Sequence, residues 1–516
     1  MTTRPPLTYP RPAAAPAQLP HSPRHRRGAA TALGGAFLLF YLTLSLHRYD
    51  RFGSGVDLAI FGQAVKHLAA GQAPVVDLKA PGFLAFGDHF DPVIALAAPL
   101  YRIWPDIRVL LCIQALLIAV AVAIVAEIAT ATLGRWRGLS AGAAFGTSVG
   151  VQNTVDFDFH EVAFAAPLLA LALRAYLLGR WRLCAALTAG LLLVKEDSAF
   201  IMLGIAVALA IRGRRALAAV LAAWAVAGLA IVLTIVIPSL SYWHRYTYAP
   251  EAEGPWTLLT ASAHSLGTSL VTDGTASRTL VLLLAGAGVI GARSPLIWAA
   301  LIPFLVRAAN ANPAYWGLGF HYNLLIEVVL FAALIDALRH RPRAEPMVWA
   351  LIAWMTAALA CGPLVTAISP QEDCSRCRAA HTELAVIPDG ATVAADAYLL
   401  PHLVDRTTGY LLTPECTDSA GHPLTPDWVV LDERTSTYGG PSWVPALTRR
   451  LASTYEEVSA GDGYLVLRRR AVARLEWPGA ASSVRVALQN GFTAPDLLFR
   501  RVRACQCDHW HARAGW

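Results

Sequence analysis

Charged residues are scarce in this chain. They make up 15% of its 516 residues, whereas about 25% is usual for a soluble globular domain. The deficit is uneven, because long apolar runs occupy residues 28–369 while the remainder has the composition of an ordinary soluble segment. This distribution excludes a purely soluble protein. It predicts an integral membrane domain over residues 28–369 and a water-soluble domain over residues 370–477.

Sequence fingerprints of soluble nucleotide-dependent enzymes are also missing. The chain has no Walker A loop, no dinucleotide-binding glycine motif, no serine-hydrolase elbow and no zinc-protease helix. An ATP-driven pump is therefore not expected. The net charge of +7 comes mostly from arginines in short loops, without a basic stripe of interleaved aromatics. We accordingly expect a lipid bilayer, and no nucleic acid, as a partner.

Apolar segments that are candidates for membrane spans recur along the chain. A bilayer core needs about 20 helical residues, and four runs meet this length: 28–47, 107–133, 216–238 and 347–369. Seven shorter runs either cross fully or are covered by neighbouring helices; they are 138–152, 161–178, 183–194, 198–211, 278–292, 294–308 and 321–338. The predicted fold is an all-α polytopic transmembrane bundle of about 11 spans, followed by a small extracytoplasmic α/β domain.

The arginines predict the orientation of this bundle in the cell membrane. Cytoplasmic loops carry an excess of Lys and Arg. With residues 1–27 as a disordered cytoplasmic tail, every dense arginine cluster between spans falls on the cytoplasmic side; the clusters lie at 135–137, 180–182, 212–215, 293 and 339–343. The long loop 48–106, the α/β domain and a C-terminal extension over residues 478–516 are then extracytoplasmic.

Asp57 begins a patterned stretch of the first outer loop. The apolar residues that follow, at 58, 60, 61, 65 and 68, suit an amphipathic helix lying along the membrane surface. Asp57 stands where an N-cap of that helix is expected, and local sequence favours this role. A carboxylate at the membrane–water boundary is also suited to act as a base or to bind a cation.

Two dense acid–histidine clusters occupy the outer loops. They are Asp88-His89-Phe90-Asp91 and Asp158-Phe159-His160-Glu161. Carboxylates and imidazoles at such spacing are able to share a divalent cation or to hold a phosphate. Asp91 precedes Pro92, which is equally typical of a helix start. Both interpretations stay open for this position.

A third site candidate is the charged triplet Lys195-Glu196-Asp197. It separates two short apolar runs, 183–194 and 198–211, and these predict a tight hairpin with its tip near the membrane. Ionisable groups at membrane depth are costly and usually pair or mark a pathway. The triplet either neutralises itself or presents Lys195 to a phosphate. His321, which begins the run 321–338, is either a substrate contact or a polar packing contact.

Residues 384–470 alternate between strand-like and helix-like segments. Strands are expected at 392–395, 428–431 and 464–467, and short helices at 397–403 and 444–451. This pattern predicts a small Rossmann-like sandwich. An oxidising exterior favours disulfides, and Cys374 and Cys377 can pair with each other or with Cys416, Cys505 or Cys507.

Several of these strings carry a family resemblance. DLAIFGQAVKHLAAG from Asp57, FGDHFDPVIALAAPLY from Phe86, DFHEVAFAAPLLALAL from Asp158, LLLVKEDSA from Leu191 and PDGATVAADAYLLPHL from Pro388 resemble the domain of unknown function 2079 family of polytopic membrane proteins. The resemblance covers residues 30 to 470, and FGDHF and KED are its most specific parts. That family is in turn similar in layout to the GT-C glycosyltransferases, which use polyprenyl-phosphate sugars.

The resemblance implies roles for particular residues. The catalytic acid of GT-C enzymes lies in the first outer loop, which is the place of Asp57, with Asp88 and His89 as further catalytic candidates. Lys195, Glu196, His160, Glu161 and His321 are then substrate-binding candidates. Asp91 and Asp158 are candidate ligands of a divalent cation, Mg or Mn. One departure is that Asp57 lacks the acidic neighbour that many GT-C enzymes show.

Three classes of function follow from these observations. The leading hypothesis is a GT-C glycosyltransferase that moves a sugar from a polyprenyl-phosphate donor to a glycan or protein acceptor of the cell envelope. A transporter with Lys195, Glu196 and Asp197 along its pathway is the second. A non-catalytic membrane scaffold is the third, and it predicts that single substitutions in the outer clusters are tolerated.

Overall fold

The computed structural model describes residues 23–248, 255–287, 289–339, 374–434 and 441–470, together with positions 350, 354, 358 and 362. The predicted span 347–369 therefore lies mostly outside the described residues. So do residues 1–22 of the predicted tail, the extension 478–516 and the cysteines Cys361, Cys505 and Cys507.

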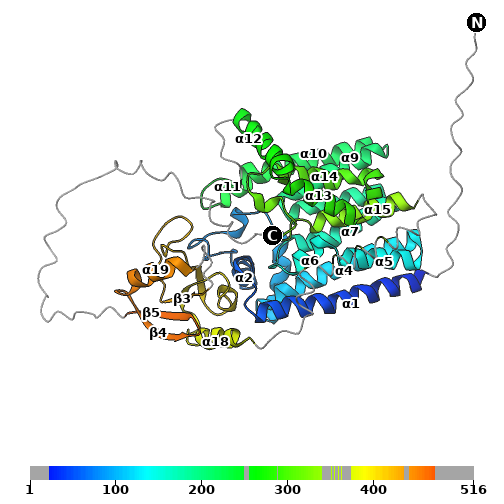
Figure 1. Ribbon diagram of the computed structural model, residues 1–516. Coiled ribbons are helices and arrows are strands. Elements are labelled where there is room, and N and C mark those ends of the chain that lie inside the picture. The colour runs from blue at the N-terminus through cyan, green and yellow to red at the C-terminus, as the bar shows by residue number, and fades with distance from the viewer. Residues whose placement is uncertain are drawn as a thin grey trace, which may run out of the picture.

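Three helices of the described chain are long and apolar enough to cross a membrane. They cover Arg27–Asp50 within α1 (Pro23–Asp50), Arg108–Leu133, which is α4, and Arg215–Leu240, which comprises α10 (Arg215–Ile231), a π-helical turn and α11 (Ile237–Leu240). They correspond to three of the four long predicted spans. Figure 1 shows α1 and α4 running side by side along the bundle.

The other helices of the bundle are shorter. They are α5 (Arg135–Gly146), α6 (Val149–Val155), α7 (Val162–Leu177), α8 (Trp181–Ala189), α9 (Ala199–Ile211), α12 (Pro255–Gly267), α13 (Thr275–Gly286), α14 (Trp298–Ala308) and α15 (Leu324–Leu338). The predicted run 138–152 is divided between α5 and α6, and the predicted outer connection 239–277 contains α12. The bundle is helical as predicted, while the count of eleven spans stays a prediction.

Small residues let α5 fold back tightly against α4. Gly134, with φ of 91°, ends α4 in a conformation that glycine adopts readily. Gly142 faces α4 so closely that a Cβ there would lie 2.5 Å from the Cβ of Ala126. Gly146 would likewise meet the Phe37 ring of α1 at 2.6 Å. The four-residue glycine spacing therefore allows close helix approach, as is common between membrane helices.

The α/β unit lies at one end of the bundle, beside α2 (Val56–Ala69) (Figure 1). Its five strands are β1 (Thr392–Ala395), β2 (Thr408–Leu411), β3 (Trp428–Asp432), β4 (Tyr455–Gly461) and β5 (Tyr464–Arg469). They are arranged in the order β2-β1-β3-β5-β4, with β2, β1 and β3 parallel and β5 antiparallel to both β3 and β4. The predicted strands at 392–395, 428–431 and 464–467 are confirmed as β1, β3 and β5.

The two faces of this sheet are covered by different parts of the chain. Side chains alternate between faces along a strand, so Val429 and Leu431 pack with α19 (Val444–Leu451). On the opposite face, Val430 and its neighbours share one hydrophobic core with α18 (Ser375–Leu384) and with the outer loop 48–106. The α/β unit therefore completes its core with the first outer loop of the membrane domain.

Polar contacts fix this docking. The Asp405 carboxylate accepts hydrogen bonds from the Tyr101 hydroxyl at 2.6 Å and from the Ile107 N–H at 2.9 Å. Gln63 donates to the Gly409 carbonyl at 2.8 Å and accepts from the Leu78 N–H at 2.9 Å. The two bonds to Asp405 and the bond from Gln63 to Gly409 join segments more than 290 residues apart in sequence.

Helix α2 differs from its predicted setting. It was expected along the membrane surface, but most of its residues from Val56 to Val65 are buried between the bundle and the α/β unit. Its N-terminal cap also differs. Gly55 is the N-cap residue and makes no side-chain cap, and Asp57 lies inside the first turn. The expectation that Asp57 caps this helix is therefore wrong.

Asp158, in the loop between α6 and α7, supplies the missing cap. Its buried carboxylate accepts the N–H of Gly55 at 2.9 Å and that of Leu58 at 3.3 Å, and it pairs with Arg48 at 3.1 Å. A carboxylate at a helix N-terminus also interacts favourably with the helix dipole. Asp158 therefore positions the helix that carries Asp57.

We predict that Asp158→Ala destabilises the protein by about 1–3 kcal/mol, because buried backbone donors and Arg48 lose their acceptor. Thermal unfolding of the purified protein in detergent measures this. Asp156→Ala is the matched control, since Asp156 is exposed and two residues away. Equal unfolding temperatures for the two variants would contradict the capping role.

Candidate functional site

Asp57 faces a buried histidine from another loop. Its Oδ2 lies 3.4 Å from Nε2 of His160; the Asp57 side chain is 36% exposed, whereas that of His160 is 7% exposed. Nδ1 of His160 lies 3.0 Å from the Asp158 carbonyl oxygen. Both ring nitrogens thus face acceptors, and only the doubly protonated ring donates to both.

The electrostatics of this pair favour its charged form. Burial alone lowers the pKa of His160, but the hydrogen bond to Asp57 and the negative charge of Asp57 outweigh burial and raise it. Burial raises the pKa of Asp57, yet His160, together with the charges of Lys79 and Lys195, lowers it below its ordinary value. The arrangement is a carboxylate, partly open to solvent, beside an imidazole whose protonated form it stabilises.

Aromatic rings fix the orientation of His160. His321 stacks on it with ring centroids 3.7 Å apart, and Phe157 stacks on it at 5.2 Å. Phe61 of α2 meets it edge to face at 5.5 Å. The sequence-predicted residues Asp57, His160 and His321 are therefore brought together, with His160 as the central ring.

A second group of predicted residues lies next to this pair. Lys195 Nζ is 2.8 Å from Glu161 Oε1, and both side chains are largely buried. Glu196 accepts from the Phe90 N–H at 3.0 Å, and its Oε1 lies 2.7 Å from His89 Nδ1. The triplet 195–197 does not neutralise itself, as one interpretation had it, because these partners of Lys195 and Glu196 come from two other outer loops.

Asp88 extends the same network. It pairs with Lys79 and accepts from the Tyr248 hydroxyl at 3.3 Å. Burial raises the pKa of Asp88, but the adjacent Lys79 and His89 lower it below its ordinary value. The His89 ring stacks on Tyr248 at 4.4 Å. The loop containing Asp88 and His89 is thus linked to the segment that follows α11.

The remaining two predicted residues, Asp91 and Asp158, do not fit a metal site. The Asp158 carboxylate is occupied by backbone donors and Arg48. Asp91 is buried, and burial together with the nearby Glu161 raises its pKa well above the ordinary value, which favours the neutral acid. Among the described residues, no group of three His, Cys, Asp or Glu side chains is placed to hold a metal ion. We therefore derive no step through a metal.

Most of the chain, including all of the candidate site, is similar to a known protein family. A family model described as "Predicted membrane protein (DUF2079)" matches residues 48–466. The chain belongs to the DUF2079 family. That match spans both the membrane domain and the α/β unit, and it includes every candidate residue described above. No curated protein matches the chain.

Among solved structures, the DUF2079 chain matches "ArnT from Cupriavidus metallidurans bound to Undecaprenyl phosphate". The two chains are 13% identical, the match covers 86% of this chain and 98% of that one, and the TM-score is 0.49. A likeness of this degree does not by itself establish a shared fold or function.

Sequence reasoning missed three members of the site: Lys79, Arg307 and Tyr248. A signal for Lys79 was present, because this DUF2079 chain contains only three lysines, at positions 66, 79 and 195, and two of them lie in the site. Arg307 packs on the Tyr322 ring, which in turn contacts His321. Arg307 could have been found from the sequence, because it lies near the predicted outer end of the run 294–308, where the positive-inside rule does not expect an arginine.

We predict that Lys195→Met lowers the stability of the protein by about 3–5 kcal/mol, because Glu161 then keeps a buried charge without its cation. Differential scanning fluorimetry of purified protein measures the effect. The double variant Lys195→Met, Glu161→Gln removes both charges and should recover much of the loss. If Lys195→Met alone unfolded at the same temperature as the wild type, the Lys195–Glu161 ion pair would not contribute to stability.

Proposed function

We propose that this protein is a membrane glycosyltransferase of GT-C type, which moves a sugar from a polyprenyl-phosphate donor to a cell-envelope acceptor on the extracytoplasmic face. The observation that carries the proposal is the Asp57–His160 pair. It places a partly exposed carboxylate beside two lysine charges at one end of an apolar helical bundle. A lipid-borne phosphate and a water-borne acceptor meet at such a boundary.

Asp57 is the proposed base. The acceptor hydroxyl oxygen attacks the anomeric carbon of the donor sugar, and its proton passes to the Asp57 carboxylate. The bond from that carbon to the phosphate oxygen breaks, and the polyprenyl phosphate leaves with the electron pair. General-base assistance of this kind contributes about 10²–10⁴-fold to the rate. His160 is a positioning residue, because it is buried and acts by orienting and charging Asp57.

The cations beside Asp57 suit the leaving group. Negative charge builds on the phosphate as the bond breaks, and preorganised cations stabilise it. Lys79 and Lys195 are the candidates, since the positive charge of each acts on Asp57 and lowers its pKa. Glu161 and Asp88 hold these two lysines in place. Positioned cations of this kind are more effective than mobile ones because they need no reorganisation.

We expect Asp57→Asn to lower transfer by about 10²–10⁴-fold, because the amide does not take up the acceptor proton. The measurement is mass spectrometry of lipid-linked sugars and envelope glycans in a deletion strain complemented with each variant. Asp77→Asn is the matched control, because Asp77 lies in the same loop and binds only the Gly82 N–H in the structure described.

In this assay a polyprenyl-phosphate sugar should accumulate, and a glycan should disappear, with Asp57→Asn but not with Asp77→Asn. Unchanged profiles in the deletion strain itself would refute the transferase proposal. Ion-coupled uptake into vesicles would then test the transporter alternative.

The pH dependence of transfer gives a separate prediction. Asp57 works as a carboxylate, so activity is present above its lowered pKa and is lost as pH falls through that value. His160→Gln removes the cation that keeps this pKa low, so the loss should begin at higher pH than in the wild type. The pH profile of transfer by purified protein measures it, and an unshifted acidic limb would contradict the positioning role.

A further inference from the structure

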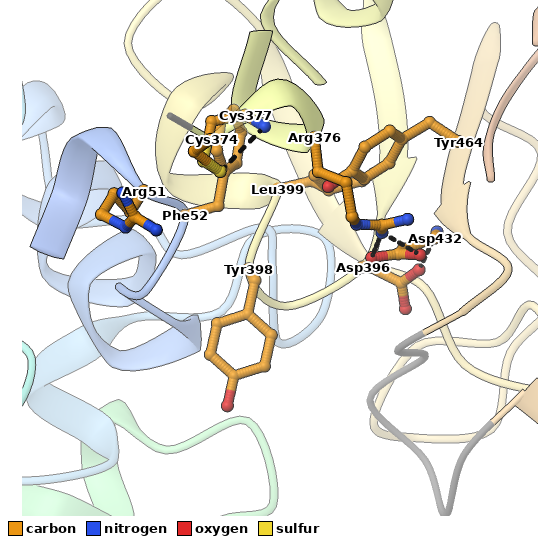
Figure 2. Close-up of a pocket in the computed structure, with 10 residues that line it drawn as sticks. All are labelled: Arg51, Phe52, Cys374, Arg376, Cys377, Asp396, Tyr398, Leu399, Asp432 and Tyr464. Atoms are coloured by element: carbon orange, nitrogen blue, oxygen red, sulfur yellow. Dashed lines mark hydrogen bonds and ion pairs between the residues drawn. A yellow bond between two sulfur atoms is a disulfide. The ribbon is translucent and has the colours of Figure 1, made fainter. Parts of the chain in front are cut away.

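A pocket separate from the Asp57 site lies between the end of α1 and the α/β unit. Its volume is about 220 Å³. Figure 2 shows Arg51 and Phe52, which follow α1, on one side, with Arg376, Asp396 and Asp432 on the other. Pockets for drug-sized ligands have volumes of about 300–1,000 Å³, so this one suits a smaller group, such as a single sugar ring.

The strand order explains where the pocket forms. Asp396 directly follows β1, and Asp432 is the last residue of β3, the parallel neighbour of β1. Beyond β3 the sheet becomes antiparallel, since β5 pairs with β3 in the opposite direction. Ligands of α/β sheets bind in the crevice outside the carboxyl ends of their parallel strands. The two aspartates thus stand at the edge of the sheet where a ligand is expected.

The two carboxylates of the pocket are buried and held in place. The side chains of Asp396 and Asp432 belong to residues that are 2% and 7% exposed. Arg376 binds both carboxylate oxygens of Asp432, at 2.9 and 2.8 Å, and Asp396 accepts the Asp432 N–H at 2.6 Å. A rigid, desolvated set of this kind distinguishes a binding pocket from a surface cluster of charges.

The chemistry of the lining favours a neutral polyhydroxylated ligand. Two arginines, Arg51 and Arg376, balance two aspartates, so the pocket has no excess charge to attract an ion. Sugar hydroxyls both donate and accept, which matches carboxylate acceptors beside guanidinium donors. Phe52 and the Tyr398 ring add apolar surface for the C–H face of a sugar, and Tyr398 is 46% exposed.

The pocket also adjoins the Asp57 site. A Cβ at Gly55 would lie 3.6 Å from Cε1 of Tyr398 and 3.3 Å from Oδ2 of Asp158. Gly55 is the N-cap residue of α2, two positions before Asp57. Tyr398 therefore separates the pocket from the start of the helix that carries the proposed base.

We infer that this pocket binds a sugar unit of the acceptor, next to the unit whose hydroxyl reaches Asp57. That this sugar belongs to the acceptor of a transfer reaction rests on the proposed transferase function. Binding of a sugar by the pocket does not depend on that function. The ligand class is a neutral glycan with a free hydroxyl. Asp396, Tyr398 and Arg376 are the residues that recognise it.

Saturation-transfer difference NMR of the full-length protein in nanodiscs tests this inference. The probes are methyl glycosides of common hexoses, pentoses and N-acetylhexosamines, titrated without any donor. We expect saturable binding of at least one glycoside, weakened about tenfold by Tyr398→Ser, which removes an aromatic contact. Asp396→Asn should weaken it similarly. Tyr242→Ser is the matched control, because Tyr242 is 40% exposed and lies outside the pocket.

The outcomes separate this inference from the transferase proposal. No saturable binding across the panel, or equal binding by wild type, Tyr398→Ser and Asp396→Asn, overturns the pocket assignment. Asp77→Asn should bind glycosides like the wild type, because Asp77 does not line the pocket. If binding maps to the pocket while envelope glycans do not depend on Asp57, the pocket stands as a glycan site and the transferase proposal fails.

Discussion

A carboxylate buried at the end of an apolar bundle must find hydrogen-bond donors, and the rest of the outer region depends on how Asp158 finds them. It binds the N–H groups at the start of α2 and pairs with Arg48 near the end of α1. This single side chain joins α1, the loop 48–106 and the loop between α6 and α7. It also sets the direction of α2, so that Asp57 meets His160. Because unpaired charge is costly away from water, the arrangement has few alternatives.

The same requirement organises the neighbouring charges. Lys195 pairs with Glu161 and Glu196 with His89, and each of these two pairs joins two different loops. Lys79 pairs with Asp88 within the loop 48–106. The α/β unit then covers α2 and shares its hydrophobic core. Its pocket is brought beside Gly55 by that docking, because Asp405 and Gln63 tie the two segments together. The Asp57–His160 pair and the pocket of the α/β unit thereby become neighbours, which is the arrangement that the proposed transfer uses.

Local patterns predicted several elements correctly. The strands β1, β3 and β5 and the helix α19 begin where the sequence pattern places them. The strand β2 and the strand β4 were missed, because short or exposed edge strands carry weaker hydrophobic patterns. In the site, the acid–histidine clusters were found from the sequence, whereas local sequence favoured Asp57 as a cap and left open whether the triplet 195–197 neutralises itself. Local sequence was wrong on the cap and could not decide the triplet, because the partners Asp158, Glu161 and His89 lie in other loops.

The sequence by itself determined that this is a membrane protein with ionisable residues gathered in its predicted outer loops, since hydropathy and charge are properties of each segment alone. Membership of the DUF2079 family follows from the sequence as well. Only the tertiary structure decided which charges pair, which carboxylate caps α2 and which remains open to solvent. Such pairings join residues about 100 positions apart, as Asp57 and His160 are. A local pattern holds no information about them, because they depend on how helices and loops pack.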